Sequence, residues 1–83
     1  MRYRKKYDHS HEVFAEKFTP GTPITGVVEM QQTPTGPTVG AFWGVDGYCH
    51  FLVPGEYLLT EDDGSRYSMA PSLFKVIYER IVP

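Results

Sequence analysis

Two short runs near the middle of the chain, residues 39–44 and 48–53, are rich in apolar and aromatic residues. Such runs, bounded by turn-forming residues, are typical of strands. The two runs flank Val45-Asp46-Gly47, and Asp-Gly in a two-residue loop favours the turn whose twist matches two paired strands. The pattern predicts a β-hairpin that is closed by Asp46 and Gly47.

A second pair of runs, residues 57–61 and 66–69, predicts another hairpin. Its connection contains Asp63-Gly64, which again has the composition of a two-residue loop. Closure at that loop would place Glu61 opposite Arg66, and opposite charges stabilise a cross-strand pair.

The segment between the two hairpins, Val53-Pro54-Gly55-Glu56, has the composition of a type II turn. Pro presets the dihedral angle of the second position, and Gly tolerates the positive φ that the third position requires. The chain is therefore expected to reverse or turn a corner here. Residues 39–69 as a whole predict a four-stranded meander.

The N-terminal half carries weaker patterns. Residues 2–7 alternate aromatic and basic side chains, which predicts a strand. Residues 12–18 also alternate and favour a strand, and a single helical turn fits the same residues. Pro and Gly interrupt the chain at 19–23 and 33–37, so residues 19–37 read as loops around one strand, 24–30.

A short helix is predicted near the C-terminus, because Pro71 and Ser72 suit a first helical turn. Phe74, Ile77 and Tyr78 then fall at positions i, i+3 and i+4, so that one face can pack on a sheet. A helix this short is stable only when it is docked. The expected fold is α+β and mostly β: a small antiparallel sheet or a partly open barrel with one short C-terminal helix.

The length of 83 residues leaves room for a single domain, 1–83, with one modest core. Apolar residues make up 41% of the chain, which is enough to build that core. No apolar run approaches the roughly 20 residues of a membrane span, and the N-terminus lacks the apolar stretch of a signal peptide. The only cysteine, Cys49, cannot form an internal disulfide. These features predict a protein of the cytoplasm with no membrane partner.

The net charge of −2 conceals an uneven distribution. Half of the basic residues lie at the N-terminus, namely Arg2, Arg4, Lys5 and Lys6. They could contact a few phosphates, with Tyr3 and Tyr7 beside them to stack on bases. Residues 7–83, however, carry four basic and ten acidic residues, a net charge of −6, which repels nucleic acid. Nucleic acid is therefore an unlikely partner, and a solvated strand face is the ordinary explanation of the basic residues.

The side chains able to bind a soft metal ion are His9, His11, Cys49 and His50. His-x-His is a weak signal, and loop histidines explain it as well. His50 follows Cys49 directly and so points to the opposite face of a strand, which argues against a Cys–His nucleophile pair. The carboxylates at 61–63 lie on a turn without an accompanying catalytic motif. The sequence therefore predicts no metal, no cofactor and no enzymatic activity.

The predicted two-residue loop divides the central hairpin into two faces. One face would carry Phe42, Cys49, Phe51 and Val53, and the other Val39, Ala41, Trp43, Tyr48, His50 and Leu52. The first set is wholly apolar and is the predicted core. Trp43, Tyr48 and His50 would then be partly exposed as a protein-binding surface. The pattern equally allows Trp43 to lie in a second small core under the N-terminal strands.

Three segments resemble a family of small phage and prophage proteins built around a Pro-Gly-Asp-Tyr or Pro-Gly-Asp-Trp motif. They are Met-Arg-Tyr-Arg-Lys-Lys at the start, Val-Phe-Ala-Glu-Lys-Phe-Thr, and the stretch from Val-Pro-Gly-Glu-Tyr to Leu-Phe-Lys-Val-Ile-Tyr-Glu. Residues 1–18 match loosely and residues 53–79 match well. The chain departs from the family pattern at Glu56, where the family has Asp, and at Ser72, where the family usually has an acid after the proline. The resemblance implies phage origin and a similar fold, but it implies no biochemical role and no site residue.

Size, acidity, the lack of a catalytic motif and this resemblance together predict a phage protein that acts by binding. The expected partner is a host or phage protein, and inhibition of a host defence system or host enzyme is one such role. A nucleic-acid or small-ligand binder and a virion or assembly accessory protein are the alternatives. A homodimer is also expected, because a small sheet has free edges and because Trp43 and Tyr48 would be exposed.

Overall fold

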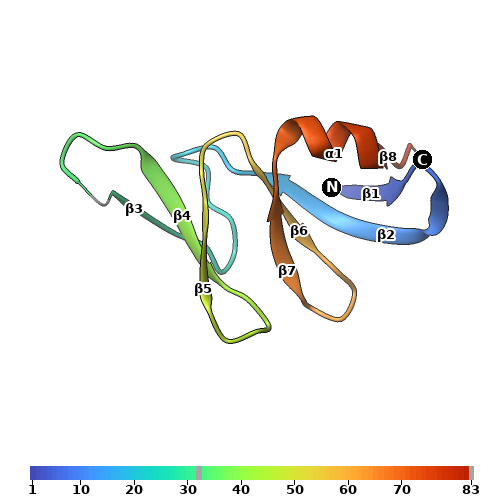
Figure 1. Ribbon diagram of the computed structural model, residues 1–83, viewed down its shortest axis with the longest axis horizontal. Coiled ribbons are helices and arrows are strands. Elements are labelled where there is room, and N and C mark those ends of the chain that lie inside the picture. Colours follow the sequence, from blue (N-terminus) through green and yellow to red (C-terminus); the bar gives the residue numbers. More distant parts are fainter. Residues whose placement is uncertain (32, 83) are drawn as a thin grey trace.

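The computed structural model describes residues 1–31 and 33–82 (Figure 1). The elements in chain order are β1 (Arg2–Lys5), β2 (Asp8–Lys17), β3 (Val28–Gln31), β4 (Thr38–Trp43), β5 (Cys49–Leu52), β6 (Tyr57–Thr60), β7 (Arg66–Met69), α1 (Pro71–Ile77) and β8 (Tyr78–Arg80). A five-stranded antiparallel sheet has the order β7-β6-β2-β1-β8, and a three-stranded one the order β3-β4-β5. The expectation of a mostly β, open structure with one short helix near the C-terminus is confirmed.

The two sheets lie one beyond the other along the long axis of the molecule (Figure 1). The principal extents are 43 × 25 × 20 Å and the radius of gyration is 13.3 Å, whereas a compact chain of this length has a radius of gyration of about 12 Å. Helix α1 crosses the five-stranded sheet, and no helix of the described residues covers the three-stranded one.

The predicted four-stranded meander is wrong, because β5 and β6 belong to different sheets. The turn between them is the expected one: Gly55 has φ 92°, and the Glu56 N–H donates to the Val53 carbonyl at 3.1 Å. The Gly55 N–H also donates to the Phe18 carbonyl at 2.9 Å, and the Glu56 carbonyl accepts from the Phe18 N–H at 2.8 Å. These two bonds fix the turn to the end of β2, so β6 pairs with β2 and the chain turns a corner.

Two groups of buried side chains hold the sheets. The first lies between α1 and the five-stranded sheet, where Phe74 packs among Val13, Ala15, Leu59 and Tyr78. The ring of Phe74 also stacks on Tyr57 with 4.1 Å between ring centroids. This contact explains why so short a helix is stable, and it confirms the predicted helix and its buried face.

The second group joins the two sheets and contains Phe18, Ile24, Phe42, Leu52 and Leu58. Gly40 on β4 allows this contact, because a Cβ atom there would lie 3.0 Å from Cε1 of Phe18 and 2.8 Å from Cγ1 of Val27. A side chain at position 40 would therefore hold the two sheets apart.

Other segments depart from the expected boundaries. Residues 12–17 form a strand and not a helical turn, and this strand begins earlier than expected, at Asp8, and ends at Lys17. The predicted strand 24–30 is wrong in its first half, because the Val27 N–H donates to the Ile24 carbonyl in a turn and β3 begins at Val28. Strand β8 was not predicted, and it pairs with β1.

Both hairpins close with three-residue loops and not with the predicted two. The Gly44 N–H donates to the Tyr48 carbonyl, and the Glu61 N–H donates to the Ser65 carbonyl, each at 2.9 Å. The last loop residue in each case is a glycine with positive φ, as three-residue hairpins require. Glu61 therefore lies opposite Ser65, and the predicted Glu61–Arg66 pair is wrong because Arg66 lies opposite Thr60.

Candidate functional site

The three-stranded sheet has an outer face on which every side chain is apolar or a thiol. Residues directly opposite in antiparallel strands share a face, and the pairs Val28↔Ala41, Ala41↔Phe51, Met30↔Val39 and Trp43↔Cys49 lie on the same side. The outer positions of β3, β4 and β5 are therefore Val28, Met30, Val39, Ala41, Trp43, Cys49 and Phe51. None of them is charged. We call these seven residues the outer face.

Most of the outer face is in contact with solvent. Trp43 is 70% exposed, Val28 64% and Phe51 47%. At the centre of the other side, Phe42 is 2% exposed and Leu52 is fully covered. That side therefore contributes to the core, whereas the outer face, apart from the buried Val39, is largely open to solvent.

The polar residues of β3 lie on the opposite side from the outer face and bind nearby loops. Oε1 of Glu29 accepts from the Gly21 N–H at 2.9 Å, and Nε2 of Gln31 donates to the Gly36 carbonyl at 3.0 Å. A surface strand usually turns its polar positions to water and its apolar positions to the core. In β3 all four residues are exposed, so that Val28 and Met30 lie in solvent together with the polar residues.

The predicted division of the central hairpin into two faces is wrong, because the three-residue loop shifts the register by one residue. Phe42 lies opposite His50, and Trp43 lies opposite Cys49. Phe51, expected in the core, is on the outer face, and Leu52 takes the buried position. Trp43 is exposed as expected, so it does not lie in a second core under the N-terminal strands.

The proposed binding residues Trp43, Tyr48 and His50 therefore do not form one surface. His50 lies on the inner side, where its ring stacks on Phe42 with 5.5 Å between centroids and its Nε2 lies 2.9 Å from Oδ2 of Asp46. Tyr48 follows the loop and is exposed. The Tyr48 N–H and the His50 ring, in that order, hold the pKa of Asp46 below its usual value. These contacts explain His50 and Asp46 as residues that order the hairpin loop.

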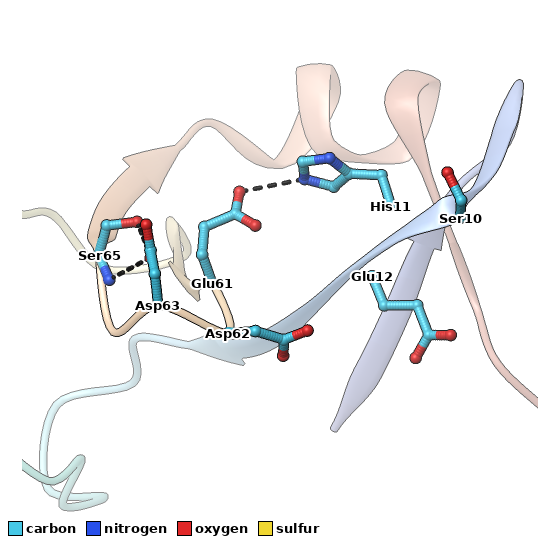
Figure 2. A pocket seen from close by; sticks show the side chains of 7 residues that line it. All are labelled: Ser10, His11, Glu12, Glu61, Asp62, Asp63 and Ser65. Carbon is cyan, nitrogen blue, oxygen red and sulfur yellow. Dashed lines mark hydrogen bonds and ion pairs between the residues drawn. The ribbon is translucent and has the colours of Figure 1, made fainter.

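An open polar hollow of about 430 Å³ lies beside the second hairpin loop (Figure 2). It is lined by Ser10, His11, Glu12, Glu61, Asp62, Asp63 and Ser65. Nε2 of His11 points toward Oε1 of Glu61 at 3.1 Å, and the same oxygen accepts from the Tyr67 hydroxyl at 2.7 Å. The hollow thus contains a histidine–glutamate–tyrosine chain at the edge of the core.

The contacts around the hollow explain its polar groups without a substrate. Tyr67 is partly buried, and this burial raises the pKa of its hydroxyl, as do the hydrogen bonds to Tyr78 and Glu61. The hydroxyl of Ser65 donates to Asp63 at 2.6 Å, and that of Ser10 donates to Asp8 at 2.6 Å. Each serine hydroxyl is thus bonded to a carboxylate and not to His11.

The four candidate metal ligands are not brought together. His9 lies 3.9 Å from Glu79 and His11 pairs with Glu61 on the five-stranded sheet, whereas Cys49 and His50 lie on the other sheet. Among residues 1–31 and 33–82, no three His, Cys, Asp or Glu side chains are grouped so as to hold a metal ion.

The N-terminal basic residues are mostly engaged with the protein itself. Arg2 pairs with Glu12 and Asp62 at 3.3 Å, and Arg4 pairs with Glu79 at 3.0 Å. The ammonium of Lys6 donates to a carbonyl at the end of α1, and Lys5 lines an apolar hollow of about 270 Å³ beside Tyr7. Arg2, Arg4 and Lys6 are therefore engaged with the protein's own surface, whereas the sequence led us to expect a solvated strand face.

Comparison with known proteins gives no relative: no family model matches the chain, and neither the curated proteins nor the solved structures contain a similar one. The resemblance to small phage proteins therefore stays a prediction. Within the part of the chain that the structure describes, no helix has the length and apolar character needed to cross a membrane.

Proposed function

We propose that this protein acts by binding a protein partner and that the outer face is its contact surface. The observation that carries the proposal is a contiguous, uncharged apolar face with Trp43 and Phe51 exposed on it. Exposed apolar patches on small proteins mark interaction sites, and aromatic side chains contribute most of the energy of protein interfaces.

The charges favour a protein over other large partners. Nucleic acid and anionic membrane surfaces are both recognised by clustered Lys and Arg. The outer face carries neither, and the protein as a whole has a net charge of −2. The face also consists of strand positions and is not one of the two hollows, whereas small ligands are usually held in concave sites.

We further propose that no reaction is catalysed, because the polar side chains that line the hollow are bonded to one another or to Asp8 and Arg2 beside it. The same proposal includes three further parts: a phage origin, a location in the cytoplasm of the bacterial host, and a host or phage protein as the target. Inhibition of a host defence system or host enzyme is the role we favour within it. These parts rest on the sequence resemblance and on the small size of the chain.

The test compares capture by three tagged proteins in lysate of phage-infected bacteria. They are the wild type, the outer-face variant Trp43→Thr/Phe51→Thr, and the control variant Leu73→Gln/Val76→Gln. Thr keeps strand propensity, and Gln keeps helix propensity. The control removes two side chains of similar exposure from α1, which lies on the other sheet.

The proposal predicts one protein that the wild type and the control retain and that the outer-face variant loses by about tenfold or more. Equal recovery by all three proteins would contradict it. Circular dichroism must show that the outer-face variant is folded, so that the loss is one of contact.

A further inference from the structure

We propose that the protein bound at the outer face is a second copy of this chain, so that two three-stranded sheets pack face to face in a two-fold symmetric dimer. This inference rests on the proposed function and names the partner at the same surface. Three properties of the outer face support it: its charge, the order of exposed and covered side chains along β4, and its area.

The first argument is charge. In a two-fold dimer the same surface meets itself, so every charged residue near the axis faces its own copy. A surface of one sign therefore repels itself, while a neutral one does not. The outer positions of β3, β4 and β5 carry no charge, and the net charge of −2 per chain gives only weak repulsion between copies.

The second argument is the order of exposed and covered side chains along β4. Ala41 lies in the central strand, with Val28 and Phe51 as its neighbours on the two sides. Val39, two residues from Ala41 on the same face, is only 9% exposed, whereas Trp43, two residues away in the other direction, is 70% exposed. A two-fold axis that crosses the strands near Ala41 places Trp43 of each copy over the covered Val39 of the other, so that the two exposed tryptophans do not meet.

The third argument is area. A fully exposed aromatic side chain presents about 150–250 Å², so Trp43 and Phe51 together offer roughly 250 Å² at exposures of 70% and 47%. Val28 and Met30 of the outer face, with exposures of 64% and 41%, and Val53, which directly follows β5 and is 49% exposed, extend the apolar surface to about 500 Å² per copy. A stable interface buries about 600–1,000 Å² per partner. The apolar surface therefore provides about half or more of the area that a dimer buries.

The chain contains its own probe of this contact. Cys49 is the only cysteine, it is exposed, and it lies beside Trp43 on the outer face. Its rate of modification by a maleimide reagent is measured from micromolar to millimolar protein. Sedimentation velocity over the same range gives the mass of the species present.

Three results together support the dimer. The wild type approaches twice the mass of one chain as its concentration rises, while Cys49 is modified about tenfold more slowly. The control Leu73→Gln/Val76→Gln does the same. The variant Trp43→Thr/Phe51→Thr keeps the mass of one chain, and its thiol reacts at a rate independent of concentration.

Two results overturn the dimer, and they differ in what they imply for the proposed function. If the wild type keeps the mass of one chain throughout but the outer-face variant loses a captured protein, the partner is another protein and the proposed function stands. If self-association and capture are both unchanged in the outer-face variant, this face is not a contact surface and both proposals fail.

Discussion

The register of the central hairpin predicts that two phenylalanines in one sheet have very different effects on stability. Phe42 is 2% exposed and belongs to the core between the sheets, whereas Phe51 is 47% exposed on the outer face. Truncation of a buried Phe to Ala costs about 3–5 kcal/mol, because it removes buried area and leaves a cavity. Truncation of Phe51 removes about half of the 1.5–3 kcal/mol that full burial is worth, so it costs roughly 1 kcal/mol.

The assay is urea denaturation followed by far-ultraviolet circular dichroism at low protein concentration, where self-association contributes least. A domain of 83 residues has a free energy of unfolding of roughly 4–12 kcal/mol, so Phe42→Ala is near the limit of what it can tolerate. With an m-value of about 1 kcal/mol/M, the midpoints of Phe42→Ala and Phe51→Ala should differ by about 2 M or more. If Phe42→Ala is unfolded in water, the milder pair Phe42→Leu and Phe51→Leu gives the same order.

Equal losses of stability in the two variants would refute this reasoning. A two-residue loop would place Phe42 and Phe51 directly opposite each other on one face, and the two truncations would then cost the same. A larger loss for Phe51→Ala than for Phe42→Ala would also refute it, since the outer face would then be the buried one.

Three further predictions concern single positions. Gly40→Ala should lower the free energy of unfolding by about 1–3 kcal/mol, because its Cβ would lie 3.0 Å from the ring of Phe18; an unchanged urea midpoint would count against this contact. Gly55→Val should cost about 1–3 kcal/mol, because a β-branched residue strongly disfavours φ 92°; wild-type stability would show another turn geometry. The hydroxyl and N–H of Ser65 lower the pKa of Asp63. The stability that Asp63 contributes is therefore present above the ordinary carboxyl pKa of 3.8 and is lost as the pH falls below that value. Denaturation of Asp63→Ala from pH 6 to pH 2 should therefore show a weaker loss on acidification than the wild type, and an identical pH profile would contradict the assignment.

The sequence predicts best the elements that local chemistry decides. Pro54 and Gly55 form the expected turn because their backbone preferences suit it without help from distant residues. Pro71 begins the expected helix, and Phe74 is buried under it because the spacing of apolar residues already describes one face. The exposure of Trp43 is also as expected.

The hairpin registers were predicted wrongly because Asp-Gly is compatible with two kinds of loop. In a two-residue loop Asp and Gly are the whole turn, whereas in a three-residue loop they are its last two residues. Here the carboxylates of Asp46 and Asp63 accept the N–H two residues further along, at 3.0 and 2.9 Å, which favours the longer loop in both hairpins. One residue of difference was enough to exchange Phe51 and Leu52 between the two faces.

The sheet order depends on contacts between distant segments, and so local patterns do not contain it. β6 pairs with β2 because the backbone of Phe18 holds the Pro54-Gly55 turn, and β8 pairs with β1 across nearly the whole chain. The outer face depends on two features that local patterns do not determine. They are the register of the central hairpin and the placement of β5 and β6 in different sheets. The alternation of Val28 and Met30 with Glu29 and Gln31 was the available signal for its third strand.

The fluorescence of Trp43 tests most directly the claim that the outer face is a contact surface. Trp43 is the only tryptophan and is 70% exposed in the single chain. At low protein concentration, the emission maximum should be that of a tryptophan in water. If the face binds a second copy, the maximum moves to shorter wavelength as the protein concentration rises. If it binds another protein, the maximum moves in the same direction when a captured, tryptophan-free partner is added. An emission maximum that stays at the solvent-exposed wavelength under both conditions would contradict the account.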